Sequence, residues 1–96
     1  MLQNVPFEEF EALVGKSVRI TDGVNHVDLE VADAHRLQNP SPREQPFAVV
    51  LRENGAKRVF GQGTYRLEHP TLGPLDLFFV PVGPDGVGVC YEVTFN

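Results

Sequence analysis

Asp33 and His35 form the pair of residues with the clearest potential for acid–base chemistry in this sequence. A carboxylate beside an imidazole orients the ring, which is a common arrangement for a general base. Strict alternation continued from Val27–Val31 would point both side chains into the core, where they would form a hydrolase-like site. A bulge near Ala32 would instead turn both polar side chains outward. The sequence leaves both arrangements open, and Ser41 is the nearest candidate nucleophile.

Histidines and carboxylates also occur at spacings that could bind a divalent metal. His26 and Asp28 are two residues apart and share one face of the same predicted strand. With His35 or His69 they would supply nitrogen and oxygen ligands. The spacing matches none of the better-defined metal motifs, and a single cysteine excludes paired-cysteine zinc motifs. We therefore predict no metal and no other cofactor.

Two further residues would join a pocket if Asp33 and His35 faced inward. Tyr65 lies on a predicted strand, and His69 follows at the entrance to a proline-containing turn. A histidine there can carry function, because sites concentrate on loops held by a rigid scaffold. It can equally cap the turn or pack on the following proline. Asp33, His35, Tyr65 and His69 together define the alternative of a small-molecule-binding barrel.

Other patterns argue against several common classes of function. Gly61-Gln62-Gly63 leads into a predicted strand rather than a helix, so the usual phosphate cradle is missing. Cys90 has no nearby histidine or lysine in the sequence to lower its pKa. Thirteen acidic residues against eight basic ones give a net charge of −5, which disfavours nucleic acid and anionic membranes as partners. We therefore expect a protein that is not an enzyme.

The elements that position these residues begin with a short helix predicted over residues 4–15. Asn4 fits the N-cap position, and Pro6 fits the first turn. The helix has one apolar stripe, made by Phe7, Phe10, Leu13 and Val14. Such a stripe predicts a helix that plugs one end of a β core.

After the helix the hydrophobic pattern becomes that of short strands, with turn signals roughly every 10 residues. The predicted strands are 17–21, 26–37, 47–51, 64–68, 75–82 and 87–95, with Val59-Phe60 either a separate strand or part of the fourth. In the last strand we expect inward positions at Val87, Val89, Tyr91, Val93 and Phe95.

This arrangement predicts a mainly β fold of about six antiparallel strands over residues 17–96. Parallel units are disfavoured because no helical stretch lies between strands. The strands would form a small barrel or a strongly bent roll, because closure removes exposed edges. The 96 residues fit a single domain.

Phe78 and Val80 indicate a candidate interaction surface. Neighbouring strand residues point to opposite faces, so Leu77 and Phe79 in the core would leave Phe78 and Val80 on the other side. Val50, on the predicted strand 47–51, could lie on the outer face in the same way. Either the N-terminal helix covers this face, or it is an exposed apolar patch of the kind that marks interaction sites.

Several sequence blocks resemble those of a known family. They are residues 45–52, 62–70, 72–82 and 91–96, and the N-terminal spacing of Phe7, Phe10, Leu13 and Gly15 also fits. On these blocks the chain resembles a family of small bacterial single-domain proteins of unknown function. Members encoded near phage-tail-like proteins imply an accessory role in a larger assembly. The resemblance supplies no catalytic residues.

We therefore predict a non-catalytic interaction or assembly module that binds a protein partner or a second copy through Phe78, Val80 and Val50. One free thiol and an N-terminus without a signal-peptide pattern predict the cytoplasm. The alternative is the small-molecule- or metal-binding barrel.

Overall fold

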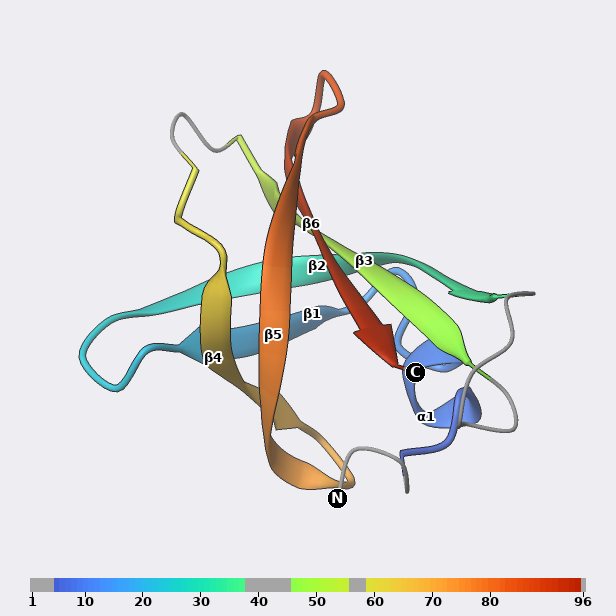
Figure 1. Ribbon diagram of the computed structural model, residues 1–96. Coiled ribbons are helices and arrows are strands. Elements are labelled where there is room, and N and C mark those ends of the chain that lie inside the picture. The colour runs from blue at the N-terminus through green and yellow to red at the C-terminus, as the bar shows by residue number, and fades with distance from the viewer. Residues whose placement is uncertain (1–4, 38–45, 56–58, 96) are drawn as a thin grey trace.

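Six antiparallel strands form a closed barrel in the computed structural model, which describes residues 5–37, 46–55 and 59–95 (Figure 1). The elements are α1 (Glu8–Glu11), β1 (Ser17–Thr21), β2 (His26–Arg36), β3 (Phe47–Asn54), β4 (Gly63–His69), β5 (Gly73–Pro84) and β6 (Gly88–Phe95). The order around the barrel is β1-β2-β3-β6-β5-β4. The predicted mainly β fold with one N-terminal helix is confirmed, and the sheet is a barrel.

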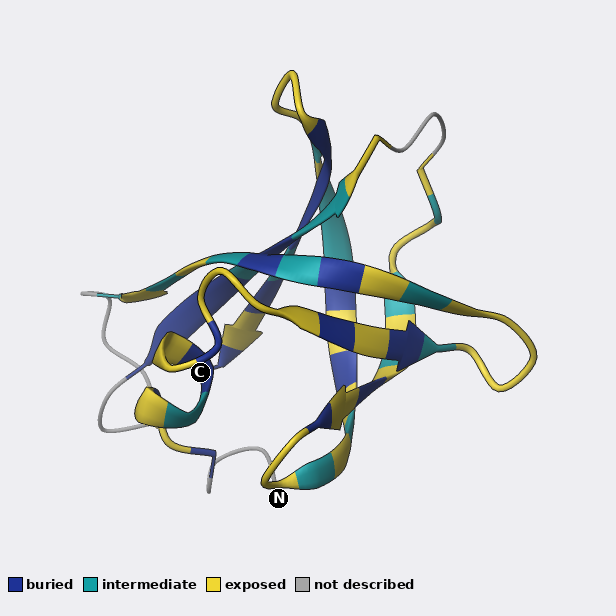
Figure 2. Cartoon of the chain, turned by 180° about the vertical axis from the view of Figure 1, so that it is seen from behind, coloured by how far each residue is buried: buried dark blue, intermediate teal, exposed yellow. Residues whose placement is uncertain are grey.

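The barrel interior is filled by the apolar residues that alternate along each strand. Buried and exposed residues accordingly alternate along the ribbons in Figure 2. The largest fully buried side chains are Tyr91, Phe10, Phe47, Phe79, Ile20, Leu29, Leu51, Leu67, Leu77, Val31 and Val49. The centre of this small barrel is therefore a packed core.

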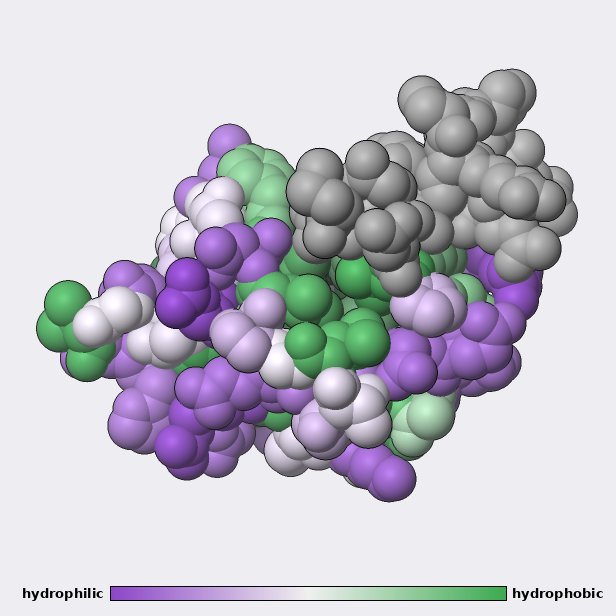
Figure 3. All heavy atoms as spheres, turned by 90° about the horizontal axis from the view of Figure 1, so that it is seen from below, coloured by the Kyte–Doolittle hydropathy of each residue, from purple (hydrophilic) through white to green (hydrophobic). Residues whose placement is uncertain are grey.

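The helix plugs one end of the barrel, as its apolar stripe predicts. The ring of Phe10 lies 5.4 Å from that of Phe95 and 6.5 Å from that of Phe47, centroid to centroid. Phe47 and Phe95 stack on each other at 4.4 Å. Val14 is exposed, so its predicted place in the buried stripe is wrong. Figure 3 views the molecule from the side of α1 and the β4–β5 turn, where apolar atoms lie among hydrophilic ones.

The helix is shorter than predicted. It covers Glu8–Glu11 rather than residues 4–15, and Asn4 lies outside the described residues. The N–H of Gly15 donates to the carbonyl oxygen of Val31 on β2 at 2.8 Å. This tertiary bond turns the chain from the helical region into β1.

Two hairpin turns share the sequence Asp-Gly-Val and the same hydrogen bonds, at residues 22–24 and 85–87. In each turn the aspartate Oδ1 accepts N–H bonds from the valine and from the next residue, at 2.8–3.0 Å. The glycines have φ values of 98° and 90°, which residues with a side chain rarely adopt. Both valines are exposed. The expected inward position of Val87 is wrong, because it belongs to the turn and β6 begins at Gly88.

Several strand boundaries also differ from the prediction, and β3 extends to Asn54 rather than ending at residue 51. Val59 and Phe60 are outside any strand, and β4 begins at Gly63. The Phe60 N–H donates to the Tyr91 hydroxyl at 3.1 Å, so a side chain takes the place of a β-ladder partner. β5 continues past its predicted end at residue 82 to Pro84, because a register shift against β6 between Pro81 and Gly83 accommodates the extra residue.

The start of β6 lies so close to β3 that a side chain at Gly88 would collide with backbone. An added Cβ would sit 2.8 Å from the carbonyl carbon of Glu53 and 2.9 Å from Cα of Asn54, with the Glu53 carbonyl oxygen nearer still. We predict that Gly88→Ala lowers the free energy of unfolding by about 2 kcal/mol or more, because overpacking displaces backbone.

Chemical denaturation of Gly88→Ala and Gly61→Ala provides the measurement. An added Cβ at Gly61 meets nothing within 4 Å, so this matched control should unfold like the wild type. Equal midpoints for the two variants would contradict the close approach of β3 and β6.

Candidate functional site

Asp33 and His35 point outward, because β2 contains a bulge. The register of β2 against β3 shifts between Val31 and Asp33, which ends the strict alternation that would have turned the pair inward. The Asp33 carboxylate lies 2.7 Å from Nδ1 of His35, and both side chains are exposed. Ala34 packs partly against the core instead. Of the two arrangements left open by the sequence, the structure therefore has the one in which a bulge turns both polar side chains outward. Ser41 lies outside the described residues.

His69 is buried at the helix end of the barrel, only 5% exposed. Its Nε2–H donates to the carbonyl oxygen of Glu9 at 2.9 Å, and its Nδ1 accepts N–H bonds from Thr71 at 3.1 Å and Leu72 at 3.2 Å. The ring also packs edge-on against Phe10 at 5.1 Å. Both ring nitrogens are thus engaged, and the side chain joins the β4–β5 turn to the helical segment.

Tyr65 lies at the other end of the barrel from His69. Its hydroxyl donates to the carbonyl oxygen of Gly61 at 2.6 Å, and its ring contacts Phe60 and Phe79. The four residues of the alternative pocket are consequently in three places: the outer face of β2, the helix end and the opposite end. The structure does not bring them together.

The histidines and carboxylates considered as an alternative metal site do not converge either. The carboxylate of Asp28 pairs with Arg19 on β1 at 3.2 Å, rather than with a histidine. In residues 5–37, 46–55 and 59–95 no group of three or more His, Cys, Asp or Glu side chains is placed to hold a metal ion.

The residues expected to bind a partner lie together on the outside of the barrel. Glu92 on β6 is opposite Val50 on β3 and opposite Val80 on β5, so the three form one row across the strands. Phe78 precedes Val80 by two positions on β5, so it lies on the same face, and it is 51% exposed. The helix contacts β2 and plugs the barrel end, and it leaves Phe78 uncovered.

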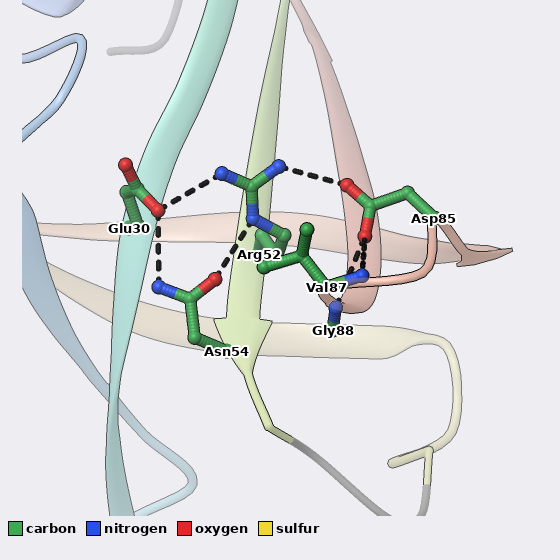
Figure 4. A network of polar contacts seen from close by, with 6 residues as sticks. All are labelled: Glu30, Arg52, Asn54, Asp85, Val87 and Gly88. Carbon is green, nitrogen blue, oxygen red and sulfur yellow. Dashed lines mark hydrogen bonds and ion pairs between the residues drawn. The ribbon is translucent and has the colours of Figure 1, made fainter.

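An ion-pair network crosses the adjacent part of the same outer surface, between β2, β3 and the β5–β6 turn (Figure 4). The Arg52 guanidinium binds the carboxylates of Glu30 at 3.0 Å and Asp85 at 2.7 Å. Asn54 donates to Glu30 at 3.0 Å and accepts from Arg52 at 2.9 Å. Because Asp85 also accepts the turn N–H bonds, this network fixes the β5–β6 turn against β3.

The pKa values of these carboxylates are lowered by the network. Hydrogen bonds from the N–H groups of Gly88 and Val87, followed by that from Arg52, hold the pKa of Asp85 well below its ordinary value. Hydrogen bonds from Asn54 and Arg52 lower the pKa of Glu30. Both carboxylates are therefore held as anions, which fits a structural role better than a role in proton transfer at neutral pH.

Cys90 is buried beside this network. Burial raises the pKa of its thiol, and the neighbouring Asp85 carboxylate raises it further. A raised pKa keeps the thiol protonated, which is the opposite of what a nucleophilic cysteine requires. Its environment agrees with the prediction from sequence that this thiol is not activated.

A cleft of about 1060 Å³ opens at the barrel end opposite the helix, and sequence reasoning missed it. Its described walls are Ile20, Thr21, Asp22, Asn25, His26, Val27, Glu53, Gly55, Val59, Phe60 and Tyr65. One signal was available: Glu53 continues the inward alternation of Val49 and Leu51 on β3. An acidic residue at an inward position marks the place where the barrel interior meets solvent.

The chain as a whole matches one protein family. The family model described as a domain of unknown function, DUF6916, covers residues 5–95. The chain belongs to the DUF6916 family. This confirms the resemblance to a family of unknown function, and the match spans the entire DUF6916 barrel together with its helix. Comparison with curated proteins and with solved structures gave no match.

In the described part of the DUF6916 chain, no helix has both the length and the apolar character needed to cross a membrane.

His69 should be important for the stability of the DUF6916 fold. Replacing it in His69→Phe keeps a flat ring but leaves the Glu9 carbonyl and the Thr71 and Leu72 N–H groups without this partner. We predict a loss of about 1–3 kcal/mol in the free energy of unfolding, the usual cost of unsatisfied buried polar groups. Thermal and chemical denaturation measure it. His26→Phe is the control, because His26 is exposed; equal losses in both variants would contradict the role of His69.

Asp85 should make stability depend on pH under acidic conditions. The pKa of Asp85 in the folded protein is below its ordinary value of 3.8. Its contribution to the free energy of unfolding is therefore complete above pH 3.8 and is lost as the pH falls through the folded pKa. We predict that the denaturation midpoint of the wild type falls more steeply between about pH 5 and pH 2 than that of Asp85→Asn, which lacks this titration. Parallel curves for the two proteins would contradict the anchoring of Asp85.

Proposed function

We propose that this DUF6916 protein is a non-catalytic module that docks a protein partner on the outer face formed by β3, β6 and β5. The contact residues are Phe78, Val80 and Val50, with Glu92 between the two valines. The observation that carries the proposal is the exposure of Phe78, whose aromatic ring stands on an ordered strand outside the core. Aromatic side chains of this kind frequently dominate the energy of protein interfaces.

The closed sheet limits how a partner can attach. A partner strand adds to a sheet through an unpaired edge, and full closure removes such edges. Side chains on the outer face offer a mode of binding that needs no free strand edge. The face is also well held, because the Arg52 network fixes the β5–β6 turn beside it.

The charge on this face favours a basic partner over a second copy. Glu92 lies at the centre of the row and has no ion pair among the described residues, and the chain carries a net charge of −5. A second copy packed about a two-fold axis near this row would bring two Glu92 carboxylates together. A partner with an Arg or Lys opposite Glu92 and an apolar pocket for Phe78 would satisfy both features.

The biological context belongs to the same proposal. A role in a larger bacterial, phage-tail-like assembly rests on the family resemblance, and a cytoplasmic location rests on the single free thiol.

Phe78→Asp should abolish the association, because it places a charge at the centre of the apolar contact. We predict that the tagged full-length chain, cross-linked in its own host, captures a defined partner that both Phe78→Asp and Glu92→Lys lose at least tenfold. A tenfold loss corresponds to about 1.4 kcal/mol. Quantitative mass spectrometry of the captured proteins measures the effect.

Val87→Asp is the matched control, because Val87 is an equally exposed valine located in a turn. It should retain the partner. Light scattering of the purified protein should give a monomer. Capture unaffected by Phe78→Asp would overturn the assigned face, and a dimer that Phe78→Asp dissociates would overturn the assigned partner chemistry.

A further inference from the structure

The junction where β3 ends at Asn54 and the chain continues into Gly55 has the residue types for a spontaneous backbone reaction. Glycine has no side chain to hinder the approach of its nitrogen to the amide of a preceding asparagine. The nitrogen of Gly55 loses a proton and attacks Cγ of Asn54, and the amide nitrogen of Asn54 gains a proton and leaves as ammonia. Water then opens the cyclic succinimide to aspartate or isoaspartate. Both residues are exposed, so solvent reaches the reacting atoms.

Hydrogen bonds tie both reacting groups to other partners (Figure 4). The Asn54 amide is held at both of its polar atoms, since Nδ2 donates to Glu30 at 3.0 Å and Oδ1 accepts from Arg52 at 2.9 Å. The N–H of Gly55 donates to the carbonyl oxygen of Val87 at 3.0 Å. Ring closure has to break these bonds, so it requires a local opening of the folded structure.

The glycine of this pair is also fixed by the shape of the chain. Its φ is 72°, a left-handed conformation that residues with a side chain rarely adopt. A bulkier residue after Asn54 would slow the reaction, but it would strain the backbone at this position. Protection of Asn54 therefore rests on the hydrogen bonds around it.

Both products would disturb the closest contact between β3 and β6. A side chain at Gly88 would already lie 2.9 Å from Cα of Asn54, so the backbones have little room to move. Isoaspartate adds one carbon to the main chain, which would displace the N–H of Gly55 from the carbonyl of Val87. Aspartate would replace the donor Nδ2 with a carboxylate oxygen beside Glu30. Neither product can remake the original contacts.

We propose that Asn54 and Gly55 form a deamidation site that the bonds to Glu30 and Arg52 keep unreacted, and that its reaction irreversibly loosens the β5–β6 turn. Local opening of the network allows the ring to close, and the product then prevents the network from forming again. The modification is thus a one-way record of opening at this turn. The inference concerns the turn itself and holds whichever partner binds Phe78.

Timed incubation of the purified full-length protein in mildly alkaline buffer, followed by peptide mass spectrometry, measures the reaction. Chromatography separates the isoaspartate and aspartate peptides. We expect Asn54 to react at least about tenfold more slowly in the folded wild type than in the chain unfolded by guanidinium chloride, because the folded chain must first open locally. Asn25, which is followed by His26, is the internal reference and should react more slowly than Asn54 in the unfolded chain.

Glu30→Ala removes the acceptor of the Asn54 amide, and we expect it to speed the reaction in the folded protein at least about fivefold. Asp28→Ala is the matched control, because it also removes a carboxylate of β2 from an ion pair, in this case with Arg19 on β1. It should leave the rate at Asn54 unchanged. Because global unfolding would also speed the reaction, the rates are compared well below the denaturation midpoints of both variants.

Amide hydrogen exchange of the separated isoaspartate form tests the consequence for the turn. We expect the N–H groups of Val87 and Gly88 to exchange faster than in the unreacted protein. Equal rates in the folded and unfolded chains, an unchanged rate in Glu30→Ala, or unchanged exchange at the turn would overturn the proposal. None of these measurements involves capture of a partner through Phe78, so the docking proposal stands or fails separately.

Discussion

Closure of the sheet is the constraint on which the other features of this molecule depend. Once β1 pairs with β4, every strand has two neighbours, so backbone hydrogen bonding between strands runs all the way round the barrel. The interior then has to be filled by side chains from the strands themselves, which explains the large buried aromatic and aliphatic residues. What remains for contact with other molecules is the outer face and the two ends.

The two ends of the barrel differ in structure. At one end, the helical segment supplies Phe10, which completes an aromatic cluster with Phe47 and Phe95, and His69 satisfies the backbone around it. At the other end, Phe60 and Tyr65 cover Tyr91 without filling the mouth, and Glu53 faces the opening. One end is thus a plug that contributes to stability, whereas the described residues at the other end border an open cleft with the rings of Phe60 and Tyr65 and the side chain of Glu53. That asymmetry distinguishes a closed end from an open one.

Much of the barrel could be predicted from sequence because local patterns determine it. The alternation of Leu29 and Val31 on β2, and of Tyr91 and Val93 on β6, identifies strands that are buried on one side. Features that depend on distant contacts could not be predicted. The extent of the helix depends on the bond from Gly15 to Val31, and the irregular conformation at Phe60 depends on stacking against Tyr91.

The candidate sites show the same division. Asp33 and His35 had two possible orientations, because a bulge leaves no sequence signal of its own and is defined by the register against β3. The Arg52–Asp85 pair joins residues 33 positions apart, so it follows only from the strand order. Phe78, in contrast, was identifiable from sequence, because strand alternation places it on the face opposite its buried neighbours Leu77 and Phe79. Alternation likewise places Glu53 on the same inward face as Leu51.

The seam between β1 and β4 is short, with register partners only from Arg19 to Thr21, whereas β4 and β5 pair along their whole common length. The seam joins segments remote in the chain, while β1–β2, β4–β5 and β5–β6 are local hairpins. Because the seam combines this short pairing with the closure of a long loop, we expect it to be the last pairing to form during folding and the first to open. Until it forms, β1 and β4 present free edges to other chains. The risk of aggregation consequently lies in the folding intermediate rather than in the finished barrel.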